Sequence, residues 1–201
     1  MTSLAASNDV ISAPALADGN YEPVARRQLL LFLAYISENF ITVLTPAVYD
    51  YQYLPEVAVS RKCHVALRVR AAAWAHVALS TVYGDTDHQT YEIVLGGWEN
   101  KRSAIRYGGR GPVVAETATP ELLDADDFRS FWISWEASTV EVGRGMKKGL
   151  DRFLTWSAPP GQRHAVNCMS VSTGDGASGQ WEFVEYLGKI NWLNAGESDA
   201  N

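Results

Sequence analysis

The chain is poor in cysteine, and this scarcity excludes two classes of small protein. Cys63 and Cys168 are its two cysteines among 201 residues. Two are too few for a disulfide scaffold and too few for a structural zinc site. Each lies in an apolar stretch, so two buried thiols are favoured over a single bridge, although the sequence leaves their pairing open.

Excess positive charge and long apolar runs are also missing. A formal net charge of -6 repels phosphate backbones, so we expect no nucleic-acid partner. The apolar run at residues 29–36 is too short to span a bilayer. Residues 1–20 lack the basic start and apolar centre of a signal peptide, and the chain contains no Asn-x-Ser/Thr sequon. These absences predict a soluble protein without a transmembrane segment, cytoplasmic by default.

The chain contains enough apolar residues to form one hydrophobic core. Apolar residues make up 47% of it and aromatic residues 11%, including seven Trp. We expect a flexible leader at residues 1–20, an extension at 21–39, one domain at 40–190 and a tail at 191–201. The extension is predicted as a helix, with a buried strand as the alternative, because its central leucines are apolar on every side.

From residue 40 onward the apolar pattern has a period of two. Val65, Leu67 and Val69 alternate with Arg68 and Arg70 on the opposite face, and similar runs recur up to residue 185. Glycine-rich and proline-rich turns separate these runs. Many short alternating strands are typical of a sandwich or barrel. The sequence therefore predicts an all-β fold, an antiparallel two-sheet β-sandwich of jelly-roll type with a short N-terminal helix or extension.

Several motifs in this region resemble the farnesoic acid O-methyltransferase domain of insects, crustaceans and other animals. The matching segments, in order, are residues 49–53, 67–71, 75–80, 91–100, 103–106, 128–135, 140–143, 153–156 and 174–183. The resemblance covers about residues 42–185, and one departure is Asp175, where the family pattern has an aromatic residue. The Trp-rich strands are also similar to concanavalin-like sandwiches.

The family name implies methyl transfer in juvenile hormone synthesis, but the residues do not supply a cofactor site. Transfer from S-adenosylmethionine usually needs a strand, a glycine-rich turn and a helix on an α/β sheet. The glycine run at 108–111 is followed by a strand-like segment, and the run at 143–145 soon meets another glycine. Both are interpreted as hairpin turns, so we expect no cofactor and favour a non-catalytic protein.

The most suggestive cluster follows the two glycines at 96–97. A turn there can bring Trp98, Glu99, Asn100 and Arg106 together at one edge of the sandwich. An aromatic ring beside planar amide, carboxylate and guanidinium groups suits a sugar, which offers C–H faces and paired hydroxyls. In the alternative interpretation Trp98 plugs the end of the core and Arg106 pairs with Glu99.

Other aromatic and polar side chains have simpler interpretations. Trp132 and Trp135 point to opposite faces of one strand, and an outward Trp132 would be a second platform for a ligand. Trp156 and Trp181 are predicted to lie in the core. His76 is interpreted as a solvated or hydrogen-bonded residue, and the histidines lack metal-ligand spacing, so we expect no metal site and no catalytic residue.

Three functions are compatible with these features. The first is a lectin-like recognition or interaction module with carbohydrate as the preferred ligand class. The second is a structural subunit that docks on protein partners through a sheet face. The third is the O-methyltransferase acting on farnesoic acid that the family name implies. A shallow groove with Trp98, Asn100 and Arg106 would favour the first, a flat apolar patch the second, and a farnesyl-sized apolar pocket the third.

Overall fold

The computed structural model describes residues 40–54, 59, 63–84 and 89–184. The predicted leader, the helical extension at 21–39 and the tail at 191–201 lie outside the described residues. No helix among the described residues is both long enough and apolar enough to cross a membrane.

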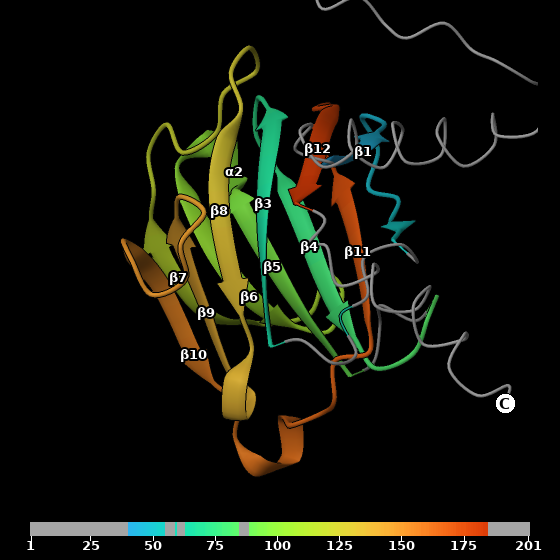
Figure 1. Ribbon diagram of the computed structural model, residues 1–201, viewed down its shortest axis with the longest axis vertical. Coiled ribbons are helices and arrows are strands. Elements are labelled where there is room, and N and C mark those ends of the chain that lie inside the picture. The colour runs from blue at the N-terminus through green and yellow to red at the C-terminus, as the bar shows by residue number, and fades with distance from the viewer. Residues whose placement is uncertain (1–39, 55–58, 60–62, 85–88, 185–201) are drawn as a thin grey trace, which may run out of the picture. The chain divides into compact units, whose positions relative to one another are not determined.

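The described chain folds into two six-stranded sheets (Figure 1). One sheet, here called sheet A, contains β1 (Phe40–Thr45), β12 (Gly179–Val184), β3 (His64–Ala71), β8 (Arg129–Ser134), β9 (Thr139–Arg144) and β10 (Arg152–Ser157), in that order. The other, sheet B, contains β2 (Gln52–Tyr53), β11 (Cys168–Thr173), β4 (Ala75–Ser80), β5 (Thr90–Gly96), β6 (Arg102–Tyr107) and β7 (Val113–Ala118).

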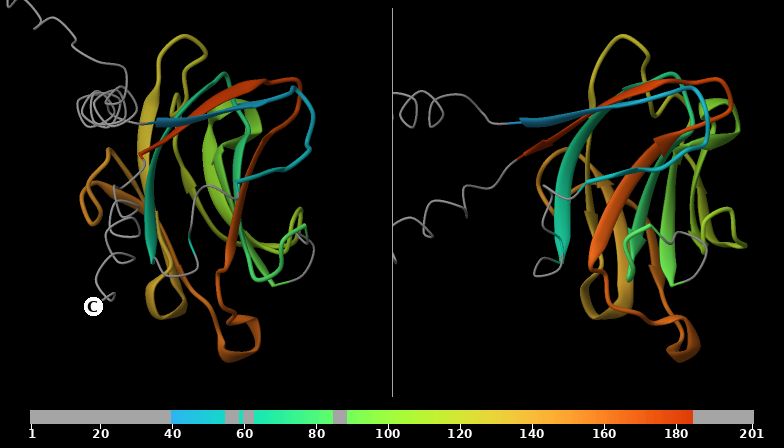
Figure 2. Two further views of the ribbon diagram at one scale, coloured as in Figure 1. Left: turned by 45° about the vertical axis from the view of Figure 1, so that its right-hand side comes forward. Right: turned by 90° about the vertical axis from the view of Figure 1, so that its right-hand side faces the viewer.

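All neighbouring strands within each sheet run antiparallel. Strands distant in sequence lie side by side, as β12 does between β1 and β3, and the two sheets form two facing layers (Figure 2). Three short helical segments connect strands: α2 (Gly97–Asn100), η1 (Glu136–Ser138) and η2 (Pro160–Gln162). The predicted antiparallel two-sheet β-sandwich of jelly-roll, concanavalin-like type is confirmed.

The core lies between the two layers and follows the alternation in the sequence. Leu67 and Val69 on β3 face inward and are fully buried, as are Trp181 and Phe183 on β12. Trp156 is partly buried against this core. The burial of large apolar side chains from both sheets supplies most of the driving force for this arrangement.

Trp132 does not provide the exposed platform expected of it. It alternates with the core residues Phe131 and Ile133, so it points away from the sheet interface, yet none of its surface is accessible. The loop between β9 and β10 covers the ring, and its Nε1 donates a hydrogen bond of 2.6 Å to the carbonyl of Leu150. A buried indole N–H needs such an acceptor, so Trp132 belongs to the architecture of sheet A.

The two cysteines form no disulfide bond. Cys63 and Cys168 are both free and half-buried, and the Cys63 thiol donates a hydrogen bond of 2.9 Å to Glu136. Two thiols were favoured over a bridge, and this is confirmed, although neither thiol is fully buried as expected.

Candidate functional site

The outer face of sheet B is covered at its centre. Every residue of β4 and β5 is buried, including those that point away from the core. Their outward set includes His76, which is 2% exposed, and Glu92, which is 0% exposed. A two-sheet sandwich normally leaves that face polar and solvated, so other parts of the chain must lie over it here.

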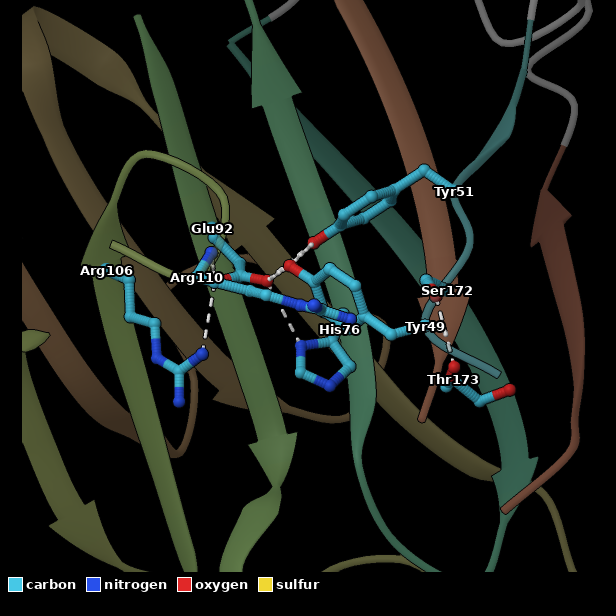
Figure 3. A network of polar contacts seen from close by, with 8 residues as sticks. All are labelled: Tyr49, Tyr51, His76, Glu92, Arg106, Arg110, Ser172 and Thr173. Atoms are coloured by element: carbon cyan, nitrogen blue, oxygen red, sulfur yellow. Dashed lines mark hydrogen bonds and ion pairs between the residues drawn. The ribbon is translucent and has the colours of Figure 1, made fainter. Parts of the chain in front are cut away.

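The segment before β2 and the connection after β6 provide this cover, and both converge on Glu92 (Figure 3). Tyr49 and Tyr51 donate their hydroxyl groups to Glu92 Oε1, Tyr51 over 2.7 Å. The backbone N–H of Arg110 donates to Glu92 Oε2 over 3.0 Å. Glu92 is therefore contacted by residues more than forty positions before it and eighteen after it.

Two further side chains, the His76 imidazole and the Arg106 guanidinium, lie close to the same carboxylate. His76 Nδ1 lies 3.3 Å from Glu92 Oε1, and Arg106 Nη1 lies 3.5 Å from Glu92 Oε2. Arg106 is the residue directly opposite Glu92 in the β5–β6 register, so the two side chains share one face of the sheet. A buried carboxylate is tolerated only when charge and hydrogen bonds compensate for lost water, and this group has both.

These contacts decide the protonation of the cluster. Burial alone would raise the pKa of Glu92, but hydrogen bonds from His76, Tyr49 and Tyr51 and the charge of His76 lower it to about 2. Burial and the adjacent carboxylate raise the pKa of Tyr49 and Tyr51 above the usual range of a phenol. Near neutral pH the cluster thus holds one buried carboxylate and two protonated phenols.

A pocket of about 320 Å³ opens beside this cluster. Its lining consists of Tyr49, Trp74, His76, Arg106, Arg110, Gly174 and Asp175. The Arg110 guanidinium carbon lies 3.8 Å from the centre of the Tyr49 ring. The rings of Trp74 and His76 are nearly parallel, with 6.1 Å between their centres. The pocket thus combines aromatic walls with guanidinium, imidazole and carboxylate groups.

Three residues of the lining have an unusual backbone. Trp74, Arg110 and Asp175 have φ angles of 53°, 58° and 56°, in the left-handed region that side chains other than glycine rarely adopt. Each such residue costs on the order of 1 kcal/mol or more. The fold holds these three in place around one pocket, which is typical of functional sites.

The predicted cluster at 96–97 lies beside this pocket, and its members have different surroundings. Trp98 is half-buried, 5.3 Å from Trp74 between ring centres, and the guanidinium carbon of Arg106 lies 5.6 Å from its ring. Trp98 therefore contacts two residues of the pocket lining without being part of that lining. Glu99 is 81% exposed and pairs with Lys101, so the expected pairing of Glu99 with Arg106 is wrong.

Asn100 is engaged by the backbone of another segment. Its amide donates to the carbonyl of Leu123 over 2.8 Å, and its carbonyl oxygen accepts from the N–H of Leu123 over 3.0 Å. Gly96, at φ 57°, is needed at this turn, because a Cβ there would lie 2.5 Å from the Asn100 oxygen. Asn100 anchors the turn and has little capacity left for a ligand.

Of the predicted residues, the structure places Arg106 in the pocket lining, Trp98 in contact with that lining, and Trp132 on the other sheet. Sequence reasoning missed Tyr49, Trp74, Glu92 and Arg110 as members of a site, although it noted the tyrosine-rich segment 49–53. His76 was expected to be solvated or hydrogen-bonded; it is buried, and its Nδ1 lies 3.3 Å from Glu92 Oε1. Asp175, the departure from the family pattern, lies on the pocket wall.

Within the part of the chain that the structure describes, no group of three or more His, Cys, Asp or Glu side chains is arranged to hold a metal ion. The pocket residues carry hydrogen-bond donors and aromatic rings, which suit an organic ligand.

The sequence is similar to a known family and to a protein of Haliotis asinina. The sequence model of a family described as farnesoic acid O-methyl transferase matches residues 47–187. A protein of Haliotis asinina named "Uncharacterized protein 5" is 33% identical over 135 residues, which cover 66% of this chain and 76% of that protein.

Among solved structures, a prokaryotic β-1,3-1,4-glucanase (lichenase) from a mouse hindgut metagenome is 11% identical, with a TM-score of 0.42 over 74% of this chain and 81% of that one. The CBM40 domain of a Ruminococcus gnavus sialidase bound to α2,3-sialyllactose is 7% identical, with a TM-score of 0.32 over 72% and 93%. Likenesses this distant carry no argument about a ligand or an activity.

Proposed function

This chain belongs to the family described as farnesoic acid O-methyl transferase, and from its pocket we propose that it is a non-catalytic recognition module with a carbohydrate ligand. The observation that carries the proposal is the lining of the 320 Å³ pocket, in which aromatic rings stand beside planar polar groups. That volume is at the small end of ligand sites, so it suits one or two sugar rings at the end of a chain.

The chemistry of the lining matches that of a sugar. Trp74 and Tyr49 offer ring surface to the apolar C–H groups of a pyranose. Arg110 and Arg106 offer N–H donors, and Asp175 offers a carboxylate acceptor. Rings and planar polar groups together can fix both the face and the orientation of a sugar.

The buried cluster around Glu92 supports the proposal by holding this lining in place. Glu92 binds Tyr49, His76, Arg106 and the backbone of Arg110, four residues that also line the pocket. A binding site whose side chains are already fixed loses less conformational entropy when a ligand arrives. Glu92 itself is inaccessible, and we assign it a positioning role.

Neither alternative function has a specific observation in its favour. The exposed large apolar side chains of the described residues come from several segments of the chain: Leu44 and Val48, Val82 and Tyr83, Val113, Met146 and Leu150. For methyl transfer, the run at 108–111 connects β6 to β7, and the run at 143–145 leads from β9 toward β10. The run at 108–111 is the hairpin turn that the sequence predicted, whereas Gly143 and Arg144 end β9 and only Gly145 of the second run lies outside that strand.

The proposal is tested by glycan-array screening of the parent protein, followed by calorimetry with the best ligand. Trp74→Ala and Arg110→Gln should each weaken binding by about 1–3 kcal/mol, because each removes a contact surface or a charged donor. Arg144→Gln is the matched control, since Arg144 also stacks on an aromatic ring, Phe153, but on sheet A. Its affinity should equal that of the parent.

Thermal melts of all three variants separate lost binding from lost folding. A parent protein that binds no glycan on the array would contradict the proposal. So would equal losses of affinity in Arg110→Gln and Arg144→Gln, because the pocket would then have no special part in binding.

A further inference from the structure

The pocket contains more hydrogen-bond donors than acceptors. Arg106 and Arg110 contribute N–H groups to its lining. Guanidinium groups donate and cannot accept, whereas a carboxylate at neutral pH accepts and cannot donate. The ligand groups that best satisfy such a lining are therefore rich in acceptor oxygens.

The buried carboxylate of Glu92 does not correct this imbalance. Its oxygens are occupied by Tyr49, Tyr51, His76 and the backbone N–H of Arg110, and no part of it is accessible. Because the Tyr49 hydroxyl already donates to Glu92, its proton is also unavailable to a ligand. Glu92 therefore offers no acceptor oxygen to a ligand, whereas the guanidinium groups of Arg106 and Arg110 line the pocket.

Arg110 is the group with the greatest unused capacity. It is exposed, and its guanidinium carbon lies over the Tyr49 ring, 3.8 Å from the ring centre. Among the residues that the structure describes, no carboxylate lies within ion-pair distance of Arg110. A stacked, unpaired guanidinium presents its edge N–H groups in the fork that binds a carboxylate bidentately.

We infer that the carbohydrate recognised at this pocket is an acidic one, in which the carboxylate of a hexuronic acid pairs with Arg110 while the sugar ring lies against Trp74. The inference rests on the proposed function and adds the ligand class. Arg106, whose charge is shared with Glu92, contributes a second donor to the same carboxylate or to a neighbouring hydroxyl.

The direction in which Asp175→Asn changes the affinity distinguishes an acidic sugar from a neutral one. It is exposed on the pocket wall, and no cation lies within ion-pair distance of it among the described residues. With an acidic sugar, Asp175 repels the ligand, so Asp175→Asn strengthens binding. With a neutral sugar, Asp175 accepts a hydroxyl hydrogen bond, and the same change weakens binding. Asn tolerates the left-handed φ of 56° at this position, so the backbone is preserved.

The experiment uses the full chain and three acidic tetrasaccharides of galacturonate, mannuronate and glucuronate. Each is compared by calorimetry with its own fully methyl-esterified form, which keeps the sugar stereochemistry and removes the charge. At least one acid should bind roughly ten- to a hundred-fold tighter than its ester, the range of a charge-assisted hydrogen bond. That preference should shrink as salt is raised from roughly 0.05 M to roughly 0.5 M, because the Debye length falls severalfold over this range.

Variants at Arg110 separate charge from geometry. Arg110→Gln should bind acid and ester equally, and Arg110→Lys should keep part of the preference because it keeps the charge. Asp175→Asn should raise the affinity for the acid, and Arg144→Gln should change nothing. Sodium acetate at millimolar concentration should not displace the bound tetrasaccharide, because it lacks the ring that contacts Trp74.

Each result decides one of two questions. If the esters or other neutral glycans bind as tightly as the acids, or if Asp175→Asn weakens binding, the acidic ligand class is overturned and the carbohydrate function stands. If neither acids, esters nor any glycan on the array binds, the proposed function fails and this inference fails with it.

Discussion

At the scale of single residues, Glu92 is the most informative side chain in the molecule. It is wholly buried on the outward side of β5 and receives contacts from Tyr49, Tyr51, His76 and Arg106. Replacing one partner of such a cluster leaves the remaining polar groups without compensation, which costs more than the lost bond alone. Changes at Glu92 should therefore affect stability first, and the pocket through it.

The first prediction concerns the pH dependence of stability. The pKa of Glu92 is lowered from 4.5 to about 2 in the folded protein. Its stabilising contribution is therefore complete above pH 4.5 and is lost as the pH falls from there through 2. The difference is on the order of 3 kcal/mol. In urea unfolding, Glu92→Gln should have a clearly lower free energy of unfolding than the parent at pH 7. The difference between the two free energies should be smaller at pH 3.

The control for this prediction is Glu141→Gln. Glu141 pairs with Arg152 on sheet A and is partly accessible to water. Surface ion pairs contribute little, so its unfolding free energy should stay within about 0.5 kcal/mol of the parent at both pH values. An equal gap between parent and Glu92→Gln at pH 7 and pH 3 would show that the carboxylate charge is not what stabilises the cluster.

At the scale of elements, the pairing of β8 with β9 shows how one glycine allows a large ring to be buried. Gly143 on β9 lies directly opposite Trp132 on β8. A Cβ on Gly143 would meet three atoms of the Trp132 ring at 2.3–2.5 Å, closer than any real contact. The ring lies across the space that a side chain would otherwise occupy, and the loop that includes Leu150 closes over it.

The second prediction follows from this packing. Gly143→Ala should lower the unfolding free energy by about 1–3 kcal/mol, the usual cost of overpacking. Gly161→Ala is the control, because nothing lies within 4 Å of its added methyl group, and it should be nearly neutral. Trp132→Ala should cost about 3–5 kcal/mol. In that background Gly143→Ala should cost little, and a purely additive double mutant would mean that the two residues do not interact.

At the scale of the whole molecule, the architecture bears on the enzymatic name of the family. The described residues form two antiparallel sheets packed face to face. Glycine-rich segments in them connect neighbouring antiparallel strands, as the run at 108–111 connects β6 to β7. Nucleotide cofactors are commonly held where a glycine-rich turn leads into a helix N-terminus, which supplies N–H groups for the phosphate or carboxylate.

The third prediction is therefore that S-adenosylmethionine does not bind to the full chain. Titration calorimetry at protein concentrations of tens of micromolar (a range of about 10–50 µM, chosen to detect the micromolar affinities typical of enzyme substrates) should show no saturable heat. Stoichiometric micromolar binding would refute this prediction whatever the fold, and would revive the methyltransferase function.

The residue patterns predicted the fold class well and the site only in part. Alternation of apolar residues, as along β3 and β12, reports directly which side chains face a core, because successive residues of a strand point to opposite faces. Glycine runs mark turns because few other residues adopt their backbone angles. Arg106 lies on the strand that follows the turn at 96–97, and its guanidinium carbon is 5.6 Å from the centre of the Trp98 ring.

The remaining site depended on long-range packing, which a local pattern does not contain. A period of two shows that Glu92 and His76 face away from the core. It does not show whether that outer face is covered by other segments, because either face of a sheet can be packed or solvated. Only the tertiary structure lays Tyr49 and Tyr51 over that face, 43 and 41 positions away from their common partner. The sequence by itself determined the sandwich, whereas the fold decided that its outward polar residues become a buried cluster beside a pocket, because burial depends on what covers a face.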